Sequence, residues 1–409
     1  MADIRPFQAI LAAPERIADI ATPPYDVMSR AEAAAMAAGR PLSFLRVTRA
    51  EITLPDAVDE HDDRVYDRAR ENYLALKRAA PLRPDTRPAY YVYALKVGDH
   101  VQTGVAAAVA VSDYDSGVVR RHENTRRDKE DDRTRHILTV GAQTGPVFLA
   151  YRDSPAIARL VADTQCAPAL YDFTADDGIR HTLWRVPAPL TAPLQQAFAA
   201  LPRLYIADGH HRAASASRVC ARRRAENPDA AGTEPYASFL AVSFPASHLR
   251  ILPYNRLVRG LNGQTPDVLL TRLREAADVL PDAPARPSQP GDVSMYLDGR
   301  WWGVRFRGGR ESLPPLERLD VSLLQARVLG PLLGIADPRT DGRIEFVGGI
   351  RGTDELERRV RDGRADVAFS MVPTSLGQLM DIADANQIMP PKSTWFEPKL
   401  RDAIVIHEI

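Results

Sequence analysis

Cysteine is nearly absent from this chain of 409 residues, in which only Cys166 and Cys220 occur. Two cysteines are too few to predict a disulfide framework or a cysteine-based zinc site. No run approaches the ~18 consecutive apolar residues that a membrane-spanning helix requires, so we expect no membrane partner. The N-terminal residues carry charges throughout and lack the apolar core of a signal peptide. These absences predict a cytoplasmic protein.

The sequence also lacks a net charge, because 53 basic residues balance 53 acidic ones. A neutral chain has no overall field that gathers nucleic acid or anionic lipid. No known nucleic-acid-binding module is recognisable either. We therefore expect a small phosphorylated molecule as the partner rather than nucleic acid, and the sequence carries no sign of an oligomeric state.

Short β-rich runs alternate with helical segments in the middle of the chain, which predicts an α/β (α+β) fold around a mixed sheet. We expect an N-terminal segment over residues 1–88, a central α/β domain over 89–260 and a C-terminal α/β domain over 261–409. The third part should contain a hairpin, because Asp298-Gly299 is a strong two-residue turn signal.

A polar turn, DGHHR, follows the apolar run LYIA and precedes an alanine- and serine-rich helix. The N-terminus of a helix presents unpaired N–H groups and a partial positive charge, and it binds anions readily. Gly209 would let the backbone approach such an anion, and His211 and Arg212 would donate to it. Asp208 and His210 are candidate catalytic residues beside them, and Asp208 is also a candidate Mg²⁺ ligand.

Two other interpretations of this turn stay open. One is a capped helix with surface histidines and no chemistry, which a DGH triplet alone would favour. The other is a metal site, although adjacent histidines in a tight turn rarely point at one zinc ion. The crowding of five such residues after an apolar strand favours the phosphate cradle.

The segment GVVRRHENTRRDKEDDRTRHI mixes guanidinium groups with carboxylates and imidazoles. Such a mixture suits a polyphosphate together with a general base, whereas a solvated, charge-laced helix is the alternative. Glu123 and His122 are the candidate catalytic residues, and Asp132 is a second candidate Mg²⁺ ligand. The candidate phosphate contacts are its arginines Arg121, Arg126, Arg127 and Arg133.

Two proline-stiffened motifs complete the candidate site. MPPKSTWFEPKL offers anion contacts, or it is a C-terminal segment docked by its aromatic residues; its candidate phosphate contacts are Lys392, Ser393 and Thr394, with Lys399 close behind. TPPYDVMS and PLSFLRV offer a pocket wall, for which the candidate residues are Tyr25, Asp26 and Arg46.

The motifs PPYDV, PLSFLRV, RHENTRRDKEDDR, TGPVF, DGHHR, LPYNR and MPPKSTWFEPKL, in this order, resemble those of the DUF1015 family of cytosolic bacterial and archaeal proteins. This resemblance spans essentially the whole chain. A strand that ends in DGHHR and opens a helix is also similar to the ParB-N/sulfiredoxin-like superfamily, where such a turn binds nucleotide phosphates. The likeness implies a ParB/sulfiredoxin-like central fold with Gly209, His211 and Arg212 as phosphate contacts.

The same superfamily includes free-serine kinases, which use a glutamate base to activate a small hydroxyl, and this likeness implies Glu123 or Glu130 as the base. The chain departs from two other relatives. It has no cysteine at the turn, so sulfinate repair is not expected, and it has no basic helix-turn-helix of a chromosome partitioner.

We therefore predict a Mg²⁺-dependent phosphoryl-transfer enzyme that acts on a small polar metabolite, with serine or phosphoserine as the specific case. ATP, ADP or pyrophosphate is the expected nucleotide or phosphate ligand. Two alternatives stay open. One is a nucleotide- or phospholigand-binding regulator with little turnover. The other is a metal-dependent hydrolase whose site is drawn from His122, His136, His210, His211 and Asp208.

Overall fold

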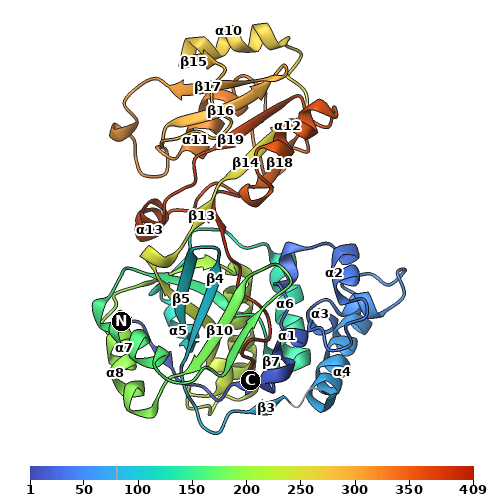
Figure 1. The fold of residues 1–409 in the computed structure, drawn as a ribbon, viewed down its shortest axis with the longest axis vertical. Coiled ribbons are helices and arrows are strands. Elements are labelled where there is room, and N and C mark those ends of the chain that lie inside the picture. The colour runs from blue at the N-terminus through green and yellow to red at the C-terminus, as the bar shows by residue number, and fades with distance from the viewer. Residues whose placement is uncertain (80–81) are drawn as a thin grey trace. The chain divides into compact units, whose positions relative to one another are not determined.

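The computed structural model of the protein describes residues 1–79 and 82–409, and its mixed α/β architecture is the one predicted. The chain divides into two compact units. Unit 1 consists of Met1–Leu249 and Pro398–Ile409, and unit 2 of Arg250–Glu397. Unit 2 is therefore inserted into unit 1, and both chain termini belong to unit 1 (Figure 1).

The predicted boundaries at residues 88 and 260 do not coincide with this division. The N-terminal segment belongs to unit 1 because its first strand, β1 (Ile4–Arg5), pairs with a central strand of the main sheet. The stretch LRILPYNRLV, predicted to lie in the central domain, supplies β14 (Tyr254–Val258), which pairs with two strands of unit 2. MPPKSTWFEPKL spans the second boundary, between Glu397 and Pro398.

The main sheet of unit 1 has nine strands in the order β6-β11-β8-β12-β5-β4-β10-β9, with β1 paired to β5. It is mixed, because β11 runs parallel to β6 and β12 runs parallel to β8, whereas its other pairs are antiparallel. The strands are β4 (Tyr91–Val97), β5 (His100–Ala110), β6 (Val119–Arg120), β8 (Val147–Tyr151), β9 (Tyr171–Thr174), β10 (Arg180–Arg185), β11 (Leu204–Asp208) and β12 (Ser238–Pro245). Shorter strand pairs join β2 (Ile10–Leu11) to β3 (Arg83–Pro84) and β7 (Ala142–Gln143) to β21 (His407–Glu408).

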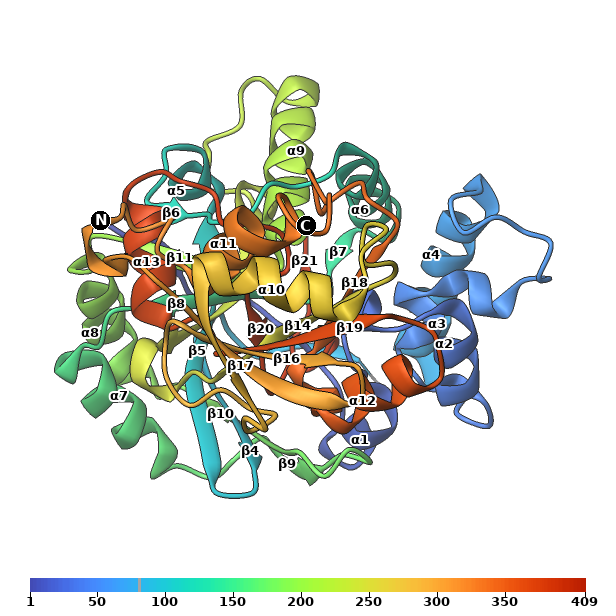
Figure 2. The ribbon, with the colours of Figure 1, turned by 90° about the horizontal axis from the view of Figure 1, so that it is seen from above.

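The helices of unit 1 are α1 (Ile17–Ile20), α2 (Arg30–Ala37), α3 (Leu45–Thr48), α4 (Asp63–Ala79), α5 (Val111–Asp115), α6 (Arg127–Val140), α7 (Pro155–Gln165), α8 (Ala188–Ala199) and α9 (His210–Glu226). α9 packs against both α5 and α6 (Figure 2). α2, α3 and α4 form a group beside α6 (Figure 1).

α9 contributes several small residues to the core of unit 1. Ala213 and Ala216 are buried in the same apolar core as strand residues Leu149 and Ile206. An alanine face lets helix and sheet pack without gaps, and it fixes the position of the first turn of α9. That first turn carries the DGHHR residues.

Unit 2 is built on a six-stranded antiparallel sheet in the order β15-β17-β16-β19-β14-β18. The predicted hairpin is confirmed: Leu297 pairs with Arg300, and both Asp298 and Gly299 have positive φ, as the tight turn requires. The other strands and helices are α10 (Pro266–Ala276), β15 (Ala277–Pro281), β16 (Asp292–Leu297), β17 (Arg300–Phe306), α11 (Asp320–Leu324), β18 (Ile344–Gly348), α12 (Asp354–Arg361), β19 (Val367–Met371) and α13 (Leu376–Asp384). A separate pair joins β13 (Ile251–Leu252) to β20 (Trp395–Phe396).

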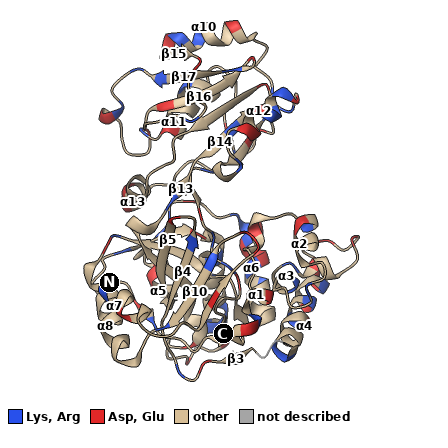
Figure 3. Cartoon of the chain, viewed as in Figure 1, with Lys and Arg blue, Asp and Glu red and all other residues tan. Residues whose placement is uncertain are grey.

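Both α6 and α12 carry basic and acidic residues (Figure 3), and on α12 the acidic residues lie in the first turn and the basic residues in the last. On α12, Glu355 pairs with Arg358 and Arg359 at helical spacing, each pair contributing about 0.2–0.5 kcal/mol. Each of these two helices has as many basic as acidic residues, as the whole chain does. Among the residues described, no helix combines the length and the apolar composition that crossing a bilayer requires.

The returning C-terminal segment should stabilise unit 1, and Leu400→Ala tests this. Leu400 is 3% exposed, so the substitution should lower the free energy of unfolding by about 2–5 kcal/mol. Leu74→Ala is the matched control, because Leu74 is 42% exposed and should lose much less. Urea unfolding of both variants measures the difference. Equal losses would mean that the C-terminal segment is not part of the core of unit 1.

Candidate functional site

Two neighbouring parallel strands end at the same edge of the main sheet. β6 runs parallel to β11, with Val119 opposite Leu204 and Arg120 opposite Tyr205. The chain leaves β6 into the segment of His122 and leaves β11 into the DGHHR turn. Ligand sites of α/β sheets lie at the carboxyl ends of strands, where loops and helix N-termini meet. The topology thus brings two of the predicted polar motifs together.

The DGHHR turn depends on its glycine. Gly209 caps α9 with a φ of 88°, a conformation that side chains other than glycine rarely adopt. A Cβ at this position would lie 2.7 Å from Nε of Arg212, which folds back over the turn. Both the backbone conformation and the position of the Arg212 side chain therefore require glycine here.

Asp208 and two cations hold the turn in place. Nη2 of Arg212 donates to Oδ2 of Asp208 at 3.1 Å, and Nζ of Lys399 lies 3.3 Å from the same oxygen. Burial disfavours the carboxylate, but the charges of Lys399 and Arg212 outweigh it and lower the pKa of Asp208 to about 2. Nη1 of Arg212 donates to the carbonyl of Pro146, whereas its buried Nε has no hydrogen-bond partner.

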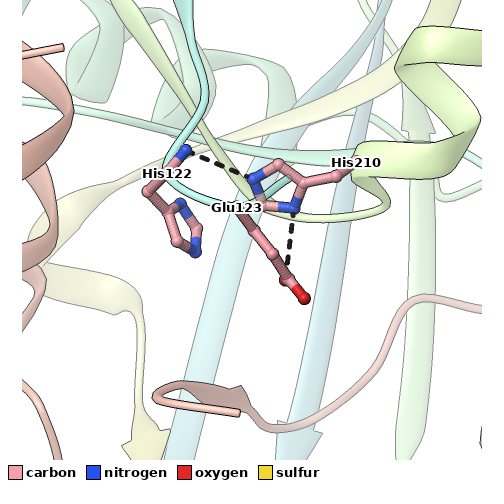
Figure 4. Close-up of side chains that lie close together, drawn as sticks. All are labelled: His122, Glu123 and His210. Carbon is pink, nitrogen blue, oxygen red and sulfur yellow. Dashed lines mark hydrogen bonds and ion pairs between the residues drawn. The ribbon is translucent and has the colours of Figure 1, made fainter. Parts of the chain in front are cut away.

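His122, Glu123 and His210 meet beside this turn (Figure 4). The backbone N–H of His122 donates weakly to Nε2 of His210 at 3.5 Å, and Nδ1 of His210 lies 3.8 Å from a carboxylate oxygen of Glu123. Both imidazoles are buried, whereas Glu123 is 46% exposed. Burial lowers the pKa of His122 to about 4 and that of His210 well below its usual range. Both rings are thus neutral at pH 7 and act as hydrogen-bonding or ligand groups rather than cations.

A second contact joins the two motifs through His211. Its Nε2 accepts the backbone N–H of Arg126 at 3.1 Å. Burial lowers the pKa of His211, which suits this acceptor role. Further along, the Ser215 hydroxyl donates to the carbonyl of Glu130 at 3.2 Å, so α9 and α6 are linked over more than one turn.

A cavity of about 40 Å³ lies behind the turn. Its polar lining includes Tyr25, Arg133, His136, Arg212 and Asp402. The volume is enough for a few water molecules, and the lining is polar enough to bind them. Of the residues predicted as a pocket wall, Tyr25 is the one that lines this cavity, with the guanidinium of Arg133 4.2 Å from its ring centroid.

Asp402 is buried in the wall of this cavity at 1% exposure. Backbone hydrogen bonds to Thr22 hold it in place. Neither of its side-chain oxygens makes a hydrogen bond of good geometry. Burial raises the pKa of Asp402 to about 7, and the Asp26 charge adds to the rise, while Arg212, Arg133 and the Tyr25 amide offset part of it.

Several predicted residues lie away from the turn or are occupied by other partners. Arg46 donates to the carbonyls of Arg40 and Ala37 and so closes the end of α2. Asp132 accepts from Tyr66 and Arg133 and contacts His61. His136, a candidate residue of the alternative metal-dependent hydrolase, contacts the carbonyl of Val47.

Asp26 and three of the predicted arginines are exposed. Arg126 pairs with Asp128, and Arg121 lies over the Tyr114 ring. Arg127, the first residue of α6, is exposed. Asp26 is exposed too, and its charge acts on His211 and Arg212.

Lys392, Ser393 and Thr394 belong to unit 2. Lys392 has a positive φ, and its carbonyl accepts from Arg256 at 3.2 Å. The Ser393 hydroxyl donates to the carbonyl of Pro390 at 2.6 Å. Within unit 1, the residue of the same motif that reaches the turn is Lys399.

Sequence analysis missed Asp402 and Gly145. A Cβ on Gly145 would overlap Oδ1 of Asp402, so the glycine of TGPVF makes room for this carboxyl group. The usable signal was an aspartate just before the apolar run AIVI, since a carboxylate in such a run is rarely buried without a reason.

Comparisons with known proteins gave a family and distant structural likenesses. The family described as "Protein of unknown function (DUF1015)" matches residues 4–322. No curated protein matches. A solved free serine kinase in complex with AMP is 13% identical, over 72% of this chain and 86% of its own, with a TM-score of 0.35.

Two other solved structures are similarly distant. A conserved hypothetical protein from Pyrococcus furiosus is 14% identical, over 73% of this chain and 93% of its own, with a TM-score of 0.34. SbnI with a C-terminal truncation, from Staphylococcus aureus, is 11% identical, over 72% and 84% of the two chains, with a TM-score of 0.38.

Gly209→Ala should destabilise unit 1 for two reasons, a left-handed φ and the displacement of Arg212. The φ alone costs roughly 1–2 kcal/mol. Gly178→Ala is the matched control, because Gly178 has a φ of 78° and no atom within 4 Å of an added Cβ. Urea unfolding should show a larger loss for Gly209→Ala than for Gly178→Ala. Equal losses would indicate that Arg212 moves aside without cost.

Asp402→Asn should stabilise the protein at neutral and alkaline pH. The folded pKa of Asp402 is about 7 against 3.8 in the unfolded chain, so between these values the folded state holds a proton that the unfolded chain has released. The free energy of unfolding therefore falls as pH rises through this window, on the order of 4 kcal/mol in total.

Urea unfolding from pH 4 to pH 8 measures this effect in the wild type and in Asp402→Asn. The two proteins should be similar in stability near pH 4 and should diverge towards pH 8, with the variant the more stable. A constant difference over the range would show that Asp402 titrates as it does in the unfolded chain.

Proposed function

This chain belongs to the DUF1015 family, whose description names no activity, and from its site we propose that it is a phosphoryl-transfer enzyme acting on a small polar metabolite. Free serine or phosphoserine is the specific substrate that we propose. The observation that supports this most directly is the meeting of the DGHHR turn with the His122 segment, through the His122–His210 and Arg126–His211 hydrogen bonds.

The phosphate groups would bind at the N-terminus of α9. This helix has 17 residues, so its first turn presents unpaired N–H groups with a partial positive charge. Arg126 and Arg127 add exposed cations at the start of α6. The transferred phosphoryl group carries its charge on oxygen atoms, and catalysis consists mainly of positioning and of compensating that charge.

Arg212 and Lys399 would compensate less of the phosphate charge than exposed cations do. Their charges are already engaged by Asp208, and Nη1 of Arg212 donates to Pro146. Nε of Arg212 is the donor of this group that has no partner. The pair therefore sets the shape of the cradle.

Glu123 is the general base of the proposal. Its carboxylate is half-exposed beside the neutral ring of His210, at the mouth of the site. A carboxylate there can accept the proton of a substrate hydroxyl as the hydroxyl attacks phosphorus. His210, the first residue of α9, lies next to this base, with Nδ1 3.8 Å from a Glu123 oxygen.

We propose that Mg²⁺ enters with the phosphates of ATP, ADP or pyrophosphate. Mg²⁺ in such sites commonly uses one or two carboxylates plus substrate phosphates. Asp208, which Arg212 and Lys399 already contact, is the carboxylate at the turn, and Asp132 accepts from Tyr66 and Arg133. A phospholigand-binding regulator would use the same cradle, and turnover distinguishes the two.

Glu123→Gln should abolish transfer and leave binding of the phosphate ligand largely intact, since it removes the base and keeps the side-chain shape. The loss of a general base lowers the rate by roughly 10²–10⁴-fold. Glu226→Gln is the matched control, because Glu226 is 49% exposed at the far end of α9.

Isothermal titration with ATP, ADP, pyrophosphate and phosphoserine measures binding, and product analysis with Mg²⁺ and serine measures turnover. No heat from any of these ligands would contradict the phosphate cradle. Binding without product over hours would contradict the enzyme and leave the regulator.

A further inference from the structure

The arrangement of His122, Glu123 and His210 resembles a metal centre more than a hydrogen-bonded triad. Their potential ligand atoms all lie within 4.8 Å of one another. Nδ1 of His210 and the Glu123 oxygen are 3.8 Å apart, too far for a hydrogen bond. Two ligands ~2.1 Å from a common tetrahedral ion lie ~3.4 Å apart, which is close to this separation.

One ring nitrogen of His122 is placed as in a metal-binding histidine. Its Nδ1 is buried and has no hydrogen-bond partner. Histidine binds metal ions through the lone pair of one neutral ring nitrogen, and Nδ1 of His122 is available for this role. A buried lone pair without a partner is otherwise costly.

The contacts that hold the two rings are weak enough for an ion to replace them. The backbone N–H of His122 donates to Nε2 of His210 at 3.5 Å, which is long for a hydrogen bond. Nδ1 of His210 lies beside the Glu123 carboxylate without a hydrogen bond between them.

We propose that His122, Glu123 and His210 bind a divalent first-row transition ion such as Zn²⁺, Mn²⁺ or Fe²⁺. Imidazole nitrogen suits these ions, whereas Mg²⁺ prefers oxygen ligands, so this ion is distinct from the Mg²⁺ that accompanies the phosphates. Three protein ligands leave one or more positions open, as in catalytic metal sites. Glu123 is the half-exposed member of the three, whereas both histidines are buried.

The site has a consequence for the proposed function without depending on it. A phosphate oxygen bound to this ion would lie beside the N-terminus of α9, so the ion would add a fixed positive charge where the neutral histidines supply none. Glu123 would then hold the ion with one oxygen, and its second oxygen would face the substrate.

The test is Co²⁺ binding to the full-length, metal-free protein, followed by visible absorption, because Co²⁺ replaces Zn²⁺ and absorbs strongly in low-symmetry nitrogen–oxygen sites. We expect one Co²⁺ per chain, displaced by one equivalent of Zn²⁺ and not by equimolar Mg²⁺. His122→Ala and His210→Ala should abolish the absorption. Glu123→Gln, at a half-exposed position that should not affect folding, should weaken binding at least about tenfold.

His407→Gln is the matched control, because His407 is a buried histidine of unit 1 whose ring contacts Pro235 and Ser238 outside the cluster. It should bind Co²⁺ as the wild type does. Absorption that is absent from the wild type, or that survives in Glu123→Gln and both alanine variants, would overturn the proposal.

Pyrophosphate titration in the presence of a chelator separates this site from the proposed function. Pyrophosphate that binds to a protein unable to bind Co²⁺ would overturn the metal site alone. Co²⁺ that binds to a protein unable to bind any phosphate ligand would overturn the phosphate cradle and leave the metal site supported.

Discussion

The ion group of Asp208, Arg212 and Lys399 is the constraint on which the rest of the site depends. One buried carboxylate is shared by a cation from its own turn and a cation from the C-terminal segment. Removing either partner of a buried pair leaves an uncompensated charge, which is strongly destabilising. The turn, the loop before β8 and the C-terminal return are therefore fixed together, because Arg212 also donates to Pro146.

Burial separates the polar residues of the site into two groups. The histidines lose their charge, since low polarity disfavours the imidazolium form, whereas Asp208 keeps its charge because two cations are close. Titratable residues of the same site thus differ in charge at pH 7: the histidines are neutral, whereas Asp208 is ionised. The imidazoles offer lone pairs and hydrogen bonds, and positive charge comes from guanidinium and ammonium groups.

The strand, the glycine turn and the helix around DGHHR could be predicted because each rests on local chemistry: an apolar run, a residue that tolerates positive φ, and an alanine-rich helix. The hairpin at Asp298 followed from the same kind of signal. The mutual approach of His122 and His210 depends on the parallel pairing of β6 with β11, and a two-residue strand leaves no periodic pattern to recognise.

The role of the C-terminal motif was beyond prediction for a related reason. Lys392 and Lys399 lie in one short motif, yet the first belongs to unit 2 and the second contacts Asp208 in unit 1. Asp402 was missed because its surroundings come from distant segments, which no local pattern reports. Contacts between segments distant in the sequence, rather than residue type, determine the surroundings of Lys392, Lys399 and Asp402.

The insertion of unit 2 has a consequence for biosynthesis. Unit 1 includes Pro398–Ile409, and the Tyr73 hydroxyl donates to a Glu408 oxygen 335 residues further along the chain. A ribosome makes the chain from its N-terminus, so the main sheet emerges long before the residues that complete its polar centre. Lys399 and Asp402 arrive only after all of unit 2 has been translated. The polar centre of unit 1 is therefore incomplete until Lys399 and Asp402 have been made.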